Sequence, residues 1–300
     1  MARRRHWLRN LGLAFLAVLV ILGTIVWRFA VRTETVRLDE HAWAVMNGGG
    51  NTLVLDSPEG ALVVDTKLFL SARSLQKEVA QLTGRPVKMV VNTHYHLDHA
   101  GGNVRHVGAE FVGHPKTREH LLATEPDTYG VGKEGERALT ATLVPDRKQF
   151  QFGDDFVDIR YLGQGHTDGD VVVFLHKRSL LHAGDLFFNG YYPTIDPGGS
   201  GSMRAWVGTL DQALAIGAAK IIPGHGPIAT NADMKNARDY LAALWAAALE
   251  GARAGKSCDD LKSSFDPKPF HLRPIPLISS FAKNVKTACA EAKAFVATPK

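Results

Sequence analysis

Eight residues at positions 92–99 decide how this chain is interpreted. They read Asn92-Thr93-His94-Tyr95-His96-Leu97-Asp98-His99. The near-continuous apolar run at 86–92 is typical of a strand buried on both faces. On the extended segment after it, residues i and i+2 point the same way, so His94 and His96 can bind one ion together. Asp98 and His99 follow as the chain turns, where two glycines permit a tight turn.

Histidine and aspartate in this pattern predict a metal site. Zinc accepts imidazole nitrogen and carboxylate oxygen at about 2.0–2.2 Å, usually with about four ligands per ion. Four such side chains within six residues rarely arise for packing reasons. Two adjacent ions need further ligands, and His166, Asp185 and His225 each follow a predicted strand beside a glycine. Alone, His166 and His225 each fit a hydrogen-bonded structural histidine. Together with Asp185 and the string, they predict a two-metal site.

The string, followed by Gly165-His166-Thr167, Gly184-Asp185 and Gly224-His225-Gly226, resembles the metallo-β-lactamase superfamily over roughly residues 34–250. The resemblance implies an α/β fold, a four-layer αββα sandwich. It also implies two ligand sets that share one residue: His94, His96 and His166 for the first zinc, Asp98, His99 and His225 for the second, and Asp185 for both. Asp65, at the end of the predicted strand 61–65, matches a supporting acid that hydrogen-bonds the site.

The implied activity is hydrolysis of a small ester, thioester, lactone or lactam by a hydroxide that bridges two Zn²⁺ ions. Iron or manganese could replace zinc. Asp185 favours metals about 3.5–4 Å apart, and Asp98 could pass a proton. An aspartate at position 185 looks more like the glyoxalase-II and lactonase branches than the true metallo-β-lactamases. Tyr191 and Tyr192 are expected either to line the substrate pocket or simply to pack.

Three alternatives stay open: a β-lactamase proper, a phosphodiesterase or nuclease, and a non-catalytic metal-binding accessory protein. The net charge is +5 and the pI about 9.2. Residues 1–32 contain six arginines and no acid, which leaves −1 for residues 33–300. The body therefore lacks the basic footprint of a nucleic-acid-binding protein, so nucleic acid is not expected as a partner.

The N-terminus favours an uncleaved signal anchor. Four arginines precede an uncharged, mostly apolar stretch from Asn10 to Trp27, which is near the roughly 17–25 residues that a membrane-spanning helix needs. Arginines before the stretch predict that the catalytic domain lies outside the cytoplasm, in the periplasm of a bacterium. Secretion after cleavage is the alternative. The expected divisions are an anchor at 1–32, a catalytic domain at 33–254 and a C-terminal helical extension at 255–300.

Between these limits the sequence predicts alternating strands and helices. Strands are expected at 41–46, 51–55, 61–65, 87–91, 109–113, 150–152, 156–162, 171–175, 179–182 and 220–223, and helices at 71–82, 115–123, 202–217 and 231–254. Thr124–Pro145 is expected to be a long loop and a possible lid. Cys258 and Cys289 are expected either to form one disulfide or to be two buried thiols.

Overall fold

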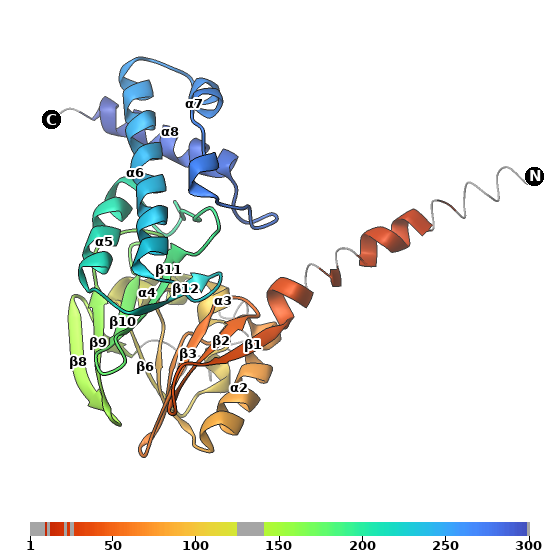
Figure 1. The fold of residues 1–300 in the computed structure, drawn as a ribbon, viewed down its shortest axis with the longest axis vertical. Coiled ribbons are helices and arrows are strands. Elements are labelled where there is room, and N and C mark those ends of the chain that lie inside the picture. Colours follow the sequence, from red (N-terminus) through yellow and green to blue (C-terminus); the bar gives the residue numbers. More distant parts are fainter. Residues whose placement is uncertain (1–9, 11–12, 21–22, 25–26, 125–140, 299–300) are drawn as a thin grey trace, which may run out of the picture.

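The computed structural model describes the chain apart from residues 1–9, 11–12, 21–22, 25–26, 125–140 and 299–300. Its body consists of two β-sheets that pack face to face, with helices on both outer sides (Figure 1). This is the layer order that the sequence predicts. Each sheet buries one face against the other sheet and the opposite face against helices, so both faces are apolar.

The first sheet has seven strands in chain order: β1 (Thr33–Arg37), β2 (Ala42–Asn47), β3 (Thr52–Ser57), β4 (Gly60–Val64), β5 (Val87–Val91), β6 (Glu110–Gly113) and β7 (Thr142–Leu143). The strands from β1 to β4 form an antiparallel meander, and those from β4 to β7 run parallel. The sequence did not predict β1, and β7 lies inside the expected loop Thr124–Pro145. Most of that loop lies outside the described residues, so the lid stays a prediction.

The second sheet has five strands in the order β12 (Lys220–His225), β11 (Leu180–Phe188), β10 (Val171–Leu175), β9 (Asp155–Tyr161) and β8 (Arg147–Phe152). β11 and β12 are parallel, and the other pairs are antiparallel. The expected strand 179–182 is too short, because β11 continues to Phe188. Asp185 therefore lies inside a strand and not past its end. The glycine and the acid in the middle of a fully buried run concealed this continuation.

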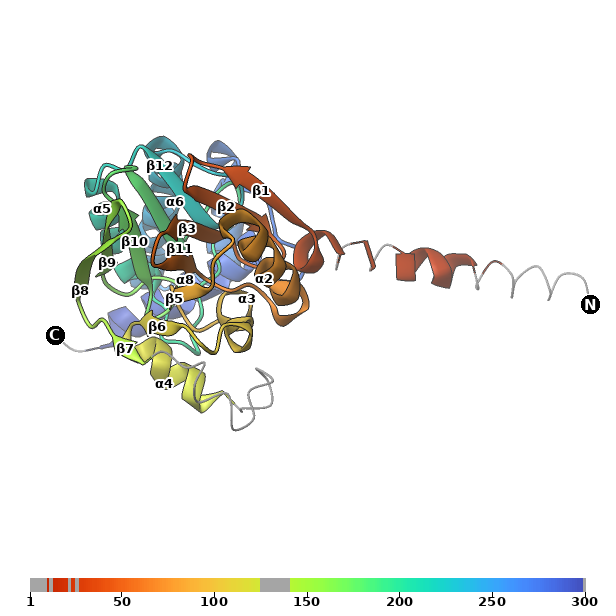
Figure 2. The ribbon, with the colours of Figure 1, turned by 90° about the horizontal axis from the view of Figure 1, so that it is seen from below.

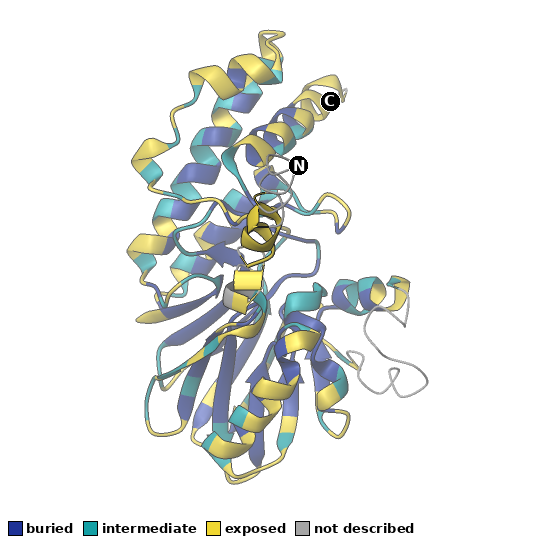
Figure 3. Cartoon of the chain, turned by 90° about the vertical axis from the view of Figure 1, so that its right-hand side faces the viewer, coloured by how far each residue is buried: buried dark blue, intermediate teal, exposed yellow. Residues whose placement is uncertain are grey.

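Side chains from both sheets meet in a central core that includes Leu53, Val91, Ile159 and Val173. The helices pack on the outer faces: α2 (Phe69–Thr83) covers the first sheet, and α5 (Met203–Ala215) and α6 (Asn231–Arg253) cover the second. α8 (Phe281–Ala297) packs against α5 and α6. Figure 3 shows the strands buried between layers whose outer faces are exposed. The remaining helices are α3 (Leu97–Ala100), α4 (Pro115–Ala123), α7 (Cys258–Ser264), the 3₁₀ helices η2 (Asn103–Arg105) and η5 (Lys268–Phe270), and the π-helix η1 (Trp27–Val31).

The first turn of α2 is hydrogen-bonded to the β2–β3 turn. Ser71 lies in the first turn of α2, whose N-cap is Leu68, and its hydroxyl donates to the carbonyl of Gly48. This bond connects α2 to the turn between β2 and β3. At the other end, the helix stops at Gly84, which adopts a left-handed conformation with φ of 63° that suits glycine.

Residues 13–20 lie away from the body (Figure 2). Residues 13–20 are helical, and their apolar side chains, such as Leu13 and Phe15, are exposed. Among the residues that the structure describes, no helix has both the length and the apolar character needed to cross a membrane. Several residues of the expected anchor lie outside the described part, and the anchor stays a prediction.

The two cysteines form a disulfide between the start of α7 and the middle of α8. The bridge closes a loop with a sequence separation of 31 residues. Cross-linking a loop of this size limits the unfolded chain and stabilises the fold by roughly 3 kcal/mol.

Replacing both cysteines with serine should therefore lower the free energy of unfolding by about 3 kcal/mol. Urea denaturation, with and without reducing agent, measures this effect. Reducing agent should bring the wild type to the level of the double variant and leave the double variant unchanged. A wild type that is insensitive to reduction would show that the bridge contributes nothing.

Candidate metal centre

Seven histidine and aspartate side chains meet where the ends of several strands converge. The segment after β5 supplies His94 and His96, and α3 supplies Asp98 and His99. His166 lies on the loop between β9 and β10. Asp185 lies within β11, and His225 ends β12. Rigid strands thus hold a site built mostly on loops and strand ends.

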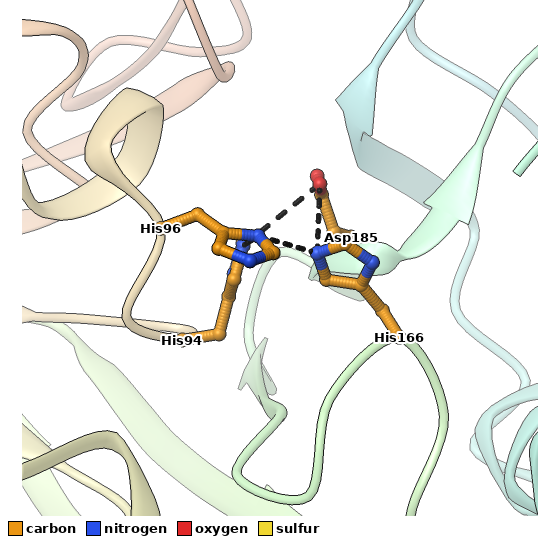
Figure 4. A group of neighbouring side chains, drawn as sticks. All are labelled: His94, His96, His166 and Asp185. Carbon is orange, nitrogen blue, oxygen red and sulfur yellow. Dashed lines mark hydrogen bonds and ion pairs between the residues drawn. The ribbon is translucent and has the colours of Figure 1, made fainter. Parts of the chain in front are cut away.

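The first group consists of His94, His96, His166 and Asp185, whose ligand atoms all lie within 4.8 Å of one another (Figure 4). Nδ1 of His96 lies 3.1 Å from Nε2 of His94 and 2.7 Å from Nε2 of His166. Three ring nitrogens therefore point at one spot. Without a shared proton or cation their lone pairs would repel, and a metal ion satisfies all three.

The second group consists of Asp98, His99 and His225, with the same 4.8 Å limit. Oδ2 of Asp98 lies 3.1 Å from Nε2 of His225 and 3.6 Å from Nε2 of His99. Two imidazole nitrogens and a carboxylate oxygen are a donor set that zinc accepts.

Asp185 lies between the two groups and faces each with a different oxygen. Oδ2 is 3.4 Å from Nε2 of His166 and 3.8 Å from Nε2 of His94. Oδ1 is 3.1 Å from Nε2 of His99 and 3.4 Å from Nε2 of His225.

Two of these atoms show that the described residues alone do not complete the site. Nε2 of His99 and Oδ1 of Asp185 are buried, and no described residue gives either atom a partner with hydrogen-bond geometry. Leaving buried polar atoms without partners is costly. Both atoms point into the space between the groups, so a cation there would satisfy both.

The outward nitrogen of several imidazoles is held by an acceptor. Nδ1 of His99 lies 2.7 Å from Oδ2 of Asp65, and Nδ1 of His166 lies 2.5 Å from the carbonyl oxygen of Thr194. Nε2 of His96 lies 2.9 Å from Oδ2 of Asp196. Each contact fixes the ring and leaves the other nitrogen free to face the site, as is usual for histidines that bind metals.

Two glycines allow the backbone to approach the ligands closely. A Cβ atom at Gly224 would lie 2.0 Å from Oδ1 of Asp185, and one at Gly50 would lie 2.3 Å from the ring of His99. Any side chain at these positions would displace a ligand. The space around the ligands is therefore shaped by the backbone of the β2–β3 turn and of β12.

The pKa values of the clustered histidines shift in two directions: those of His94 and His166 are lowered, and that of His225 is raised. Burial lowers the pKa of His94 and lowers that of His166 to about 4, so both are neutral and able to bind a metal. Burial opposes protonation of His225 too, but Asp185 and Asp98 raise its pKa to about 9. In the metal-free protein, the positive charge of protonated His225 therefore partly offsets the negative charge of Asp185 and Asp98, as a metal ion would.

A family comparison agrees with this geometry. Residues 45–225 match the model of the metallo-beta-lactamase superfamily. The chain belongs to this superfamily. The match covers all seven clustered side chains and the strands from β3 to β12, and it shows that the protein is an enzyme of this superfamily.

Individual relatives and neighbours are distant. The 2,4-dinitroanisole O-demethylase subunit alpha of Nocardioides sp. (strain JS1661) is 24% identical over 239 residues, covering 78% of this chain and 69% of that protein. Metallo-beta-lactamase IND-1 of Chryseobacterium indologenes is 25% identical over 180 residues, covering 58% of this chain and 71% of that protein. The solved metallo-beta-lactamase from Pontibacter korlensis has a TM-score of 0.61 at 20% identity and covers 70% of this chain and 99% of that one, which shows the fold.

Tyr191 and Tyr192, the two tyrosines considered for the substrate pocket, lie in different environments. Tyr191 lines the cavity over the metal centre. Tyr192 does not: its ring is buried and packs near Tyr240 and Phe281 under the C-terminal helices. Of the two alternatives, Tyr192 therefore follows the packing one, because neighbouring residues of an extended segment point to opposite sides.

The sequence does not predict two residues that support the metal centre, Asp196 and Lys67. Asp196 accepts from the hydroxyl of Tyr95 and contacts His96. Lys67 is fully buried, and its ammonium donates to the carbonyl oxygens of residues 45, 47 and 50, which fixes the β2–β3 turn. Neither lies in a motif, and only the folded chain brings them to the site. The carboxylate of Asp65, in contrast, lies where the sequence suggested.

The raised pKa of His225 predicts how the stability of the metal-free protein depends on pH. A histidine whose pKa rises on folding, from about 6.5 to about 9, stabilises the fold fully below pH 6.5, and this contribution is lost as the pH approaches 9. Metal-free wild type should therefore exceed H225N in unfolding free energy by up to about 3 kcal/mol at pH 6, and by much less at pH 9.5.

Denaturant unfolding in a chelator across this range measures the difference between the two proteins. Burial lowers the pKa of Lys67 to about 7, so this residue also titrates in the same range. Its effect is the same in both proteins and cancels in the difference between their unfolding free energies. The control is H271N, since His271 is exposed and has a left-handed φ that asparagine tolerates. A wild-type advantage over H225N that is constant from pH 6 to 9.5 would contradict the assignment.

Proposed function

We propose that this protein is a binuclear metal-dependent hydrolase, with zinc as the expected metal, that cleaves a small ester, thioester, lactone or lactam. The observation that carries the proposal is the position of Asp185, whose two carboxylate oxygens face two separate groups of imidazoles. One carboxylate shared in this way favours two neighbouring metal ions. Nε2 of His99 and Oδ1 of Asp185, two buried atoms at the same place without a described partner in hydrogen-bond geometry, support it.

Metal ions in such a site supply Lewis acidity and a water-derived nucleophile near neutral pH. The chain's own residues prepare the site for them. His94 and His166 are neutral ligands whose rings are fixed from behind. Asp98 is the most exposed carboxylate of the centre and lines the cavity, so it can accept a proton from the nucleophile and return it to the leaving group.

Replacing Asp185 with asparagine tests the proposal. D185N should bind fewer than two metal ions per chain, and its kcat/KM should fall roughly 100-fold or more, since a ligand shared by both ions is lost. Metal analysis and hydrolysis of lactone, thioester, ester and lactam substrates measure both effects. D259N, at an exposed acid of α7, is the matched control. Two retained metals with wild-type turnover in D185N would refute the shared-ligand scheme.

Hydrolysis of β-lactams is the second candidate. Relatives and solved neighbours of this chain carry the name metallo-beta-lactamase. The same substrate panel separates the candidates, because a β-lactamase should hydrolyse lactams far faster than lactones or thioesters.

We further propose that residues 1–32 carry the enzyme to the outside of the cytoplasmic membrane and keep it attached there. Four arginines before an apolar stretch support this orientation, and a disulfide suits an oxidising compartment. Alkaline phosphatase fused to the C-terminus, expressed in a bacterium, should be active and remain in the carbonate-washed membrane fraction. Deleting residues 1–32 should abolish that activity. An inactive fusion of the full chain would disprove export, and a soluble, shortened product would show cleavage.

A further inference from the structure

A cavity of about 380 Å³ lies over the metal centre, and its charged lining is restricted to the metal centre itself. The ionisable lining groups are His96, Asp98, His166, Asp185 and His225, apart from the phenol of Tyr191. No lysine or arginine occurs among the described lining residues. When the histidines of the centre bind metal, a carboxylate on a substrate would therefore find no lysine or arginine in the described wall.

Much of the remaining wall is apolar, and part of it comes from outside the family-matched region. Leu68 and Phe188 belong to residues 45–225, which the superfamily model matches. Ala30 comes from η1, and Ile275 and Ile278 come from the segment before α8. The segments on both sides of the common domain thus meet at its active-site cavity. Their contribution lies outside the superfamily match.

The segment that carries Ile278 is held in place. The carbonyl oxygens of residues 277 and 278 accept from the ammonium of Lys283, at 2.6 and 2.9 Å. Asn284, one residue further on in α8, donates to the carbonyl of Pro193 at 2.7 Å. These contacts present Leu277 and Ile278 in a fixed turn even though they are 91% and 53% exposed. Exposed apolar side chains beside a catalytic cavity mark a surface that an apolar ligand can cover.

We propose that the enzyme acts on uncharged substrates whose scissile group carries an apolar chain or ring, and that Ile275 and Ile278 receive this apolar part. The inference rests on the proposed hydrolytic function and adds its substrate class. The relative named 2,4-dinitroanisole O-demethylase supports it, since dinitroanisole is an uncharged aromatic molecule.

If the enzyme instead preferred anionic substrates, Arg273 is the cation that would bind them. It is exposed and lies outside the cavity lining, but its guanidinium lies 5.3 Å from the centre of the Tyr191 ring. An anionic substrate would have to reach this cation across Tyr191. A test therefore has to separate binding by the apolar wall from binding by Arg273.

Hydroxamates allow the test to be made without knowing the natural substrate, because they chelate divalent metals through two oxygens. Calorimetric titration of the zinc-loaded full chain should compare acetohydroxamate, hexanohydroxamate and the monohydroxamate of adipic acid, which has six carbons and a terminal carboxylate. Hexanohydroxamate should bind at least about tenfold more tightly than acetohydroxamate, since four added methylenes are partly buried. The adipic compound should lose this advantage.

The variant I278N should lower the hexano-to-aceto affinity ratio about threefold or more. V296N is the matched control, since Val296 is an exposed apolar residue near the end of α8 and does not line the cavity, and it should leave the ratio unchanged. Equal affinities of the three compounds, or tightest binding of the adipic compound that is lost in R273Q, would overturn the inference alone. Failure of all three compounds to bind, with fewer than two zinc ions per chain, would instead overturn the proposed function on which it rests.

Discussion

The arrangement of the site depends on one carboxylate placed between two groups of imidazoles. Asp185 can face both groups because β11 continues past Gly184, while β12 runs parallel beside it and ends at His225. Gly224 provides the space for the carboxylate. A shift of this strand pair by one residue would turn Asp185 to the other face of the sheet and separate the two groups.

The residues around this carboxylate fix the orientation of the imidazole rings. Asp65 is held by the backbone and hydroxyl of Thr93 and in turn contacts His99. Asp196 and the carbonyl of Thr194 act similarly on His96 and His166. The rings are therefore oriented before any ion arrives, and ordering them on binding costs little. In the metal-free protein, the proton held by His225 offsets the negative charge of Asp98 and Asp185.

The sequence alone predicts the ligands that are neighbours in the chain. It does not predict the residues that reach the site only through tertiary contacts. The string from His94 to His99 places four groups within one turn, so periodicity and residue type suffice to find them. His166, Asp185 and His225 were found through their neighbouring glycines, but the continuation of β11 through Asp185 was not, because its glycine and acid interrupt an apolar pattern. Asp196 and the wall residue Ile278 lie in segments without a motif, and only the tertiary fold brings them to the cavity.

In the proposed centre, Asp185 joins two metal ions. Anomalous X-ray diffraction at the zinc absorption edge, from crystals of the zinc-loaded protein, would locate these ions. Two anomalous peaks about 3.5–4 Å apart are expected, one beside His94, His96 and His166 and the other beside Asp98, His99 and His225, with Asp185 between them. A single peak, or two peaks that do not both contact Asp185, would contradict this arrangement.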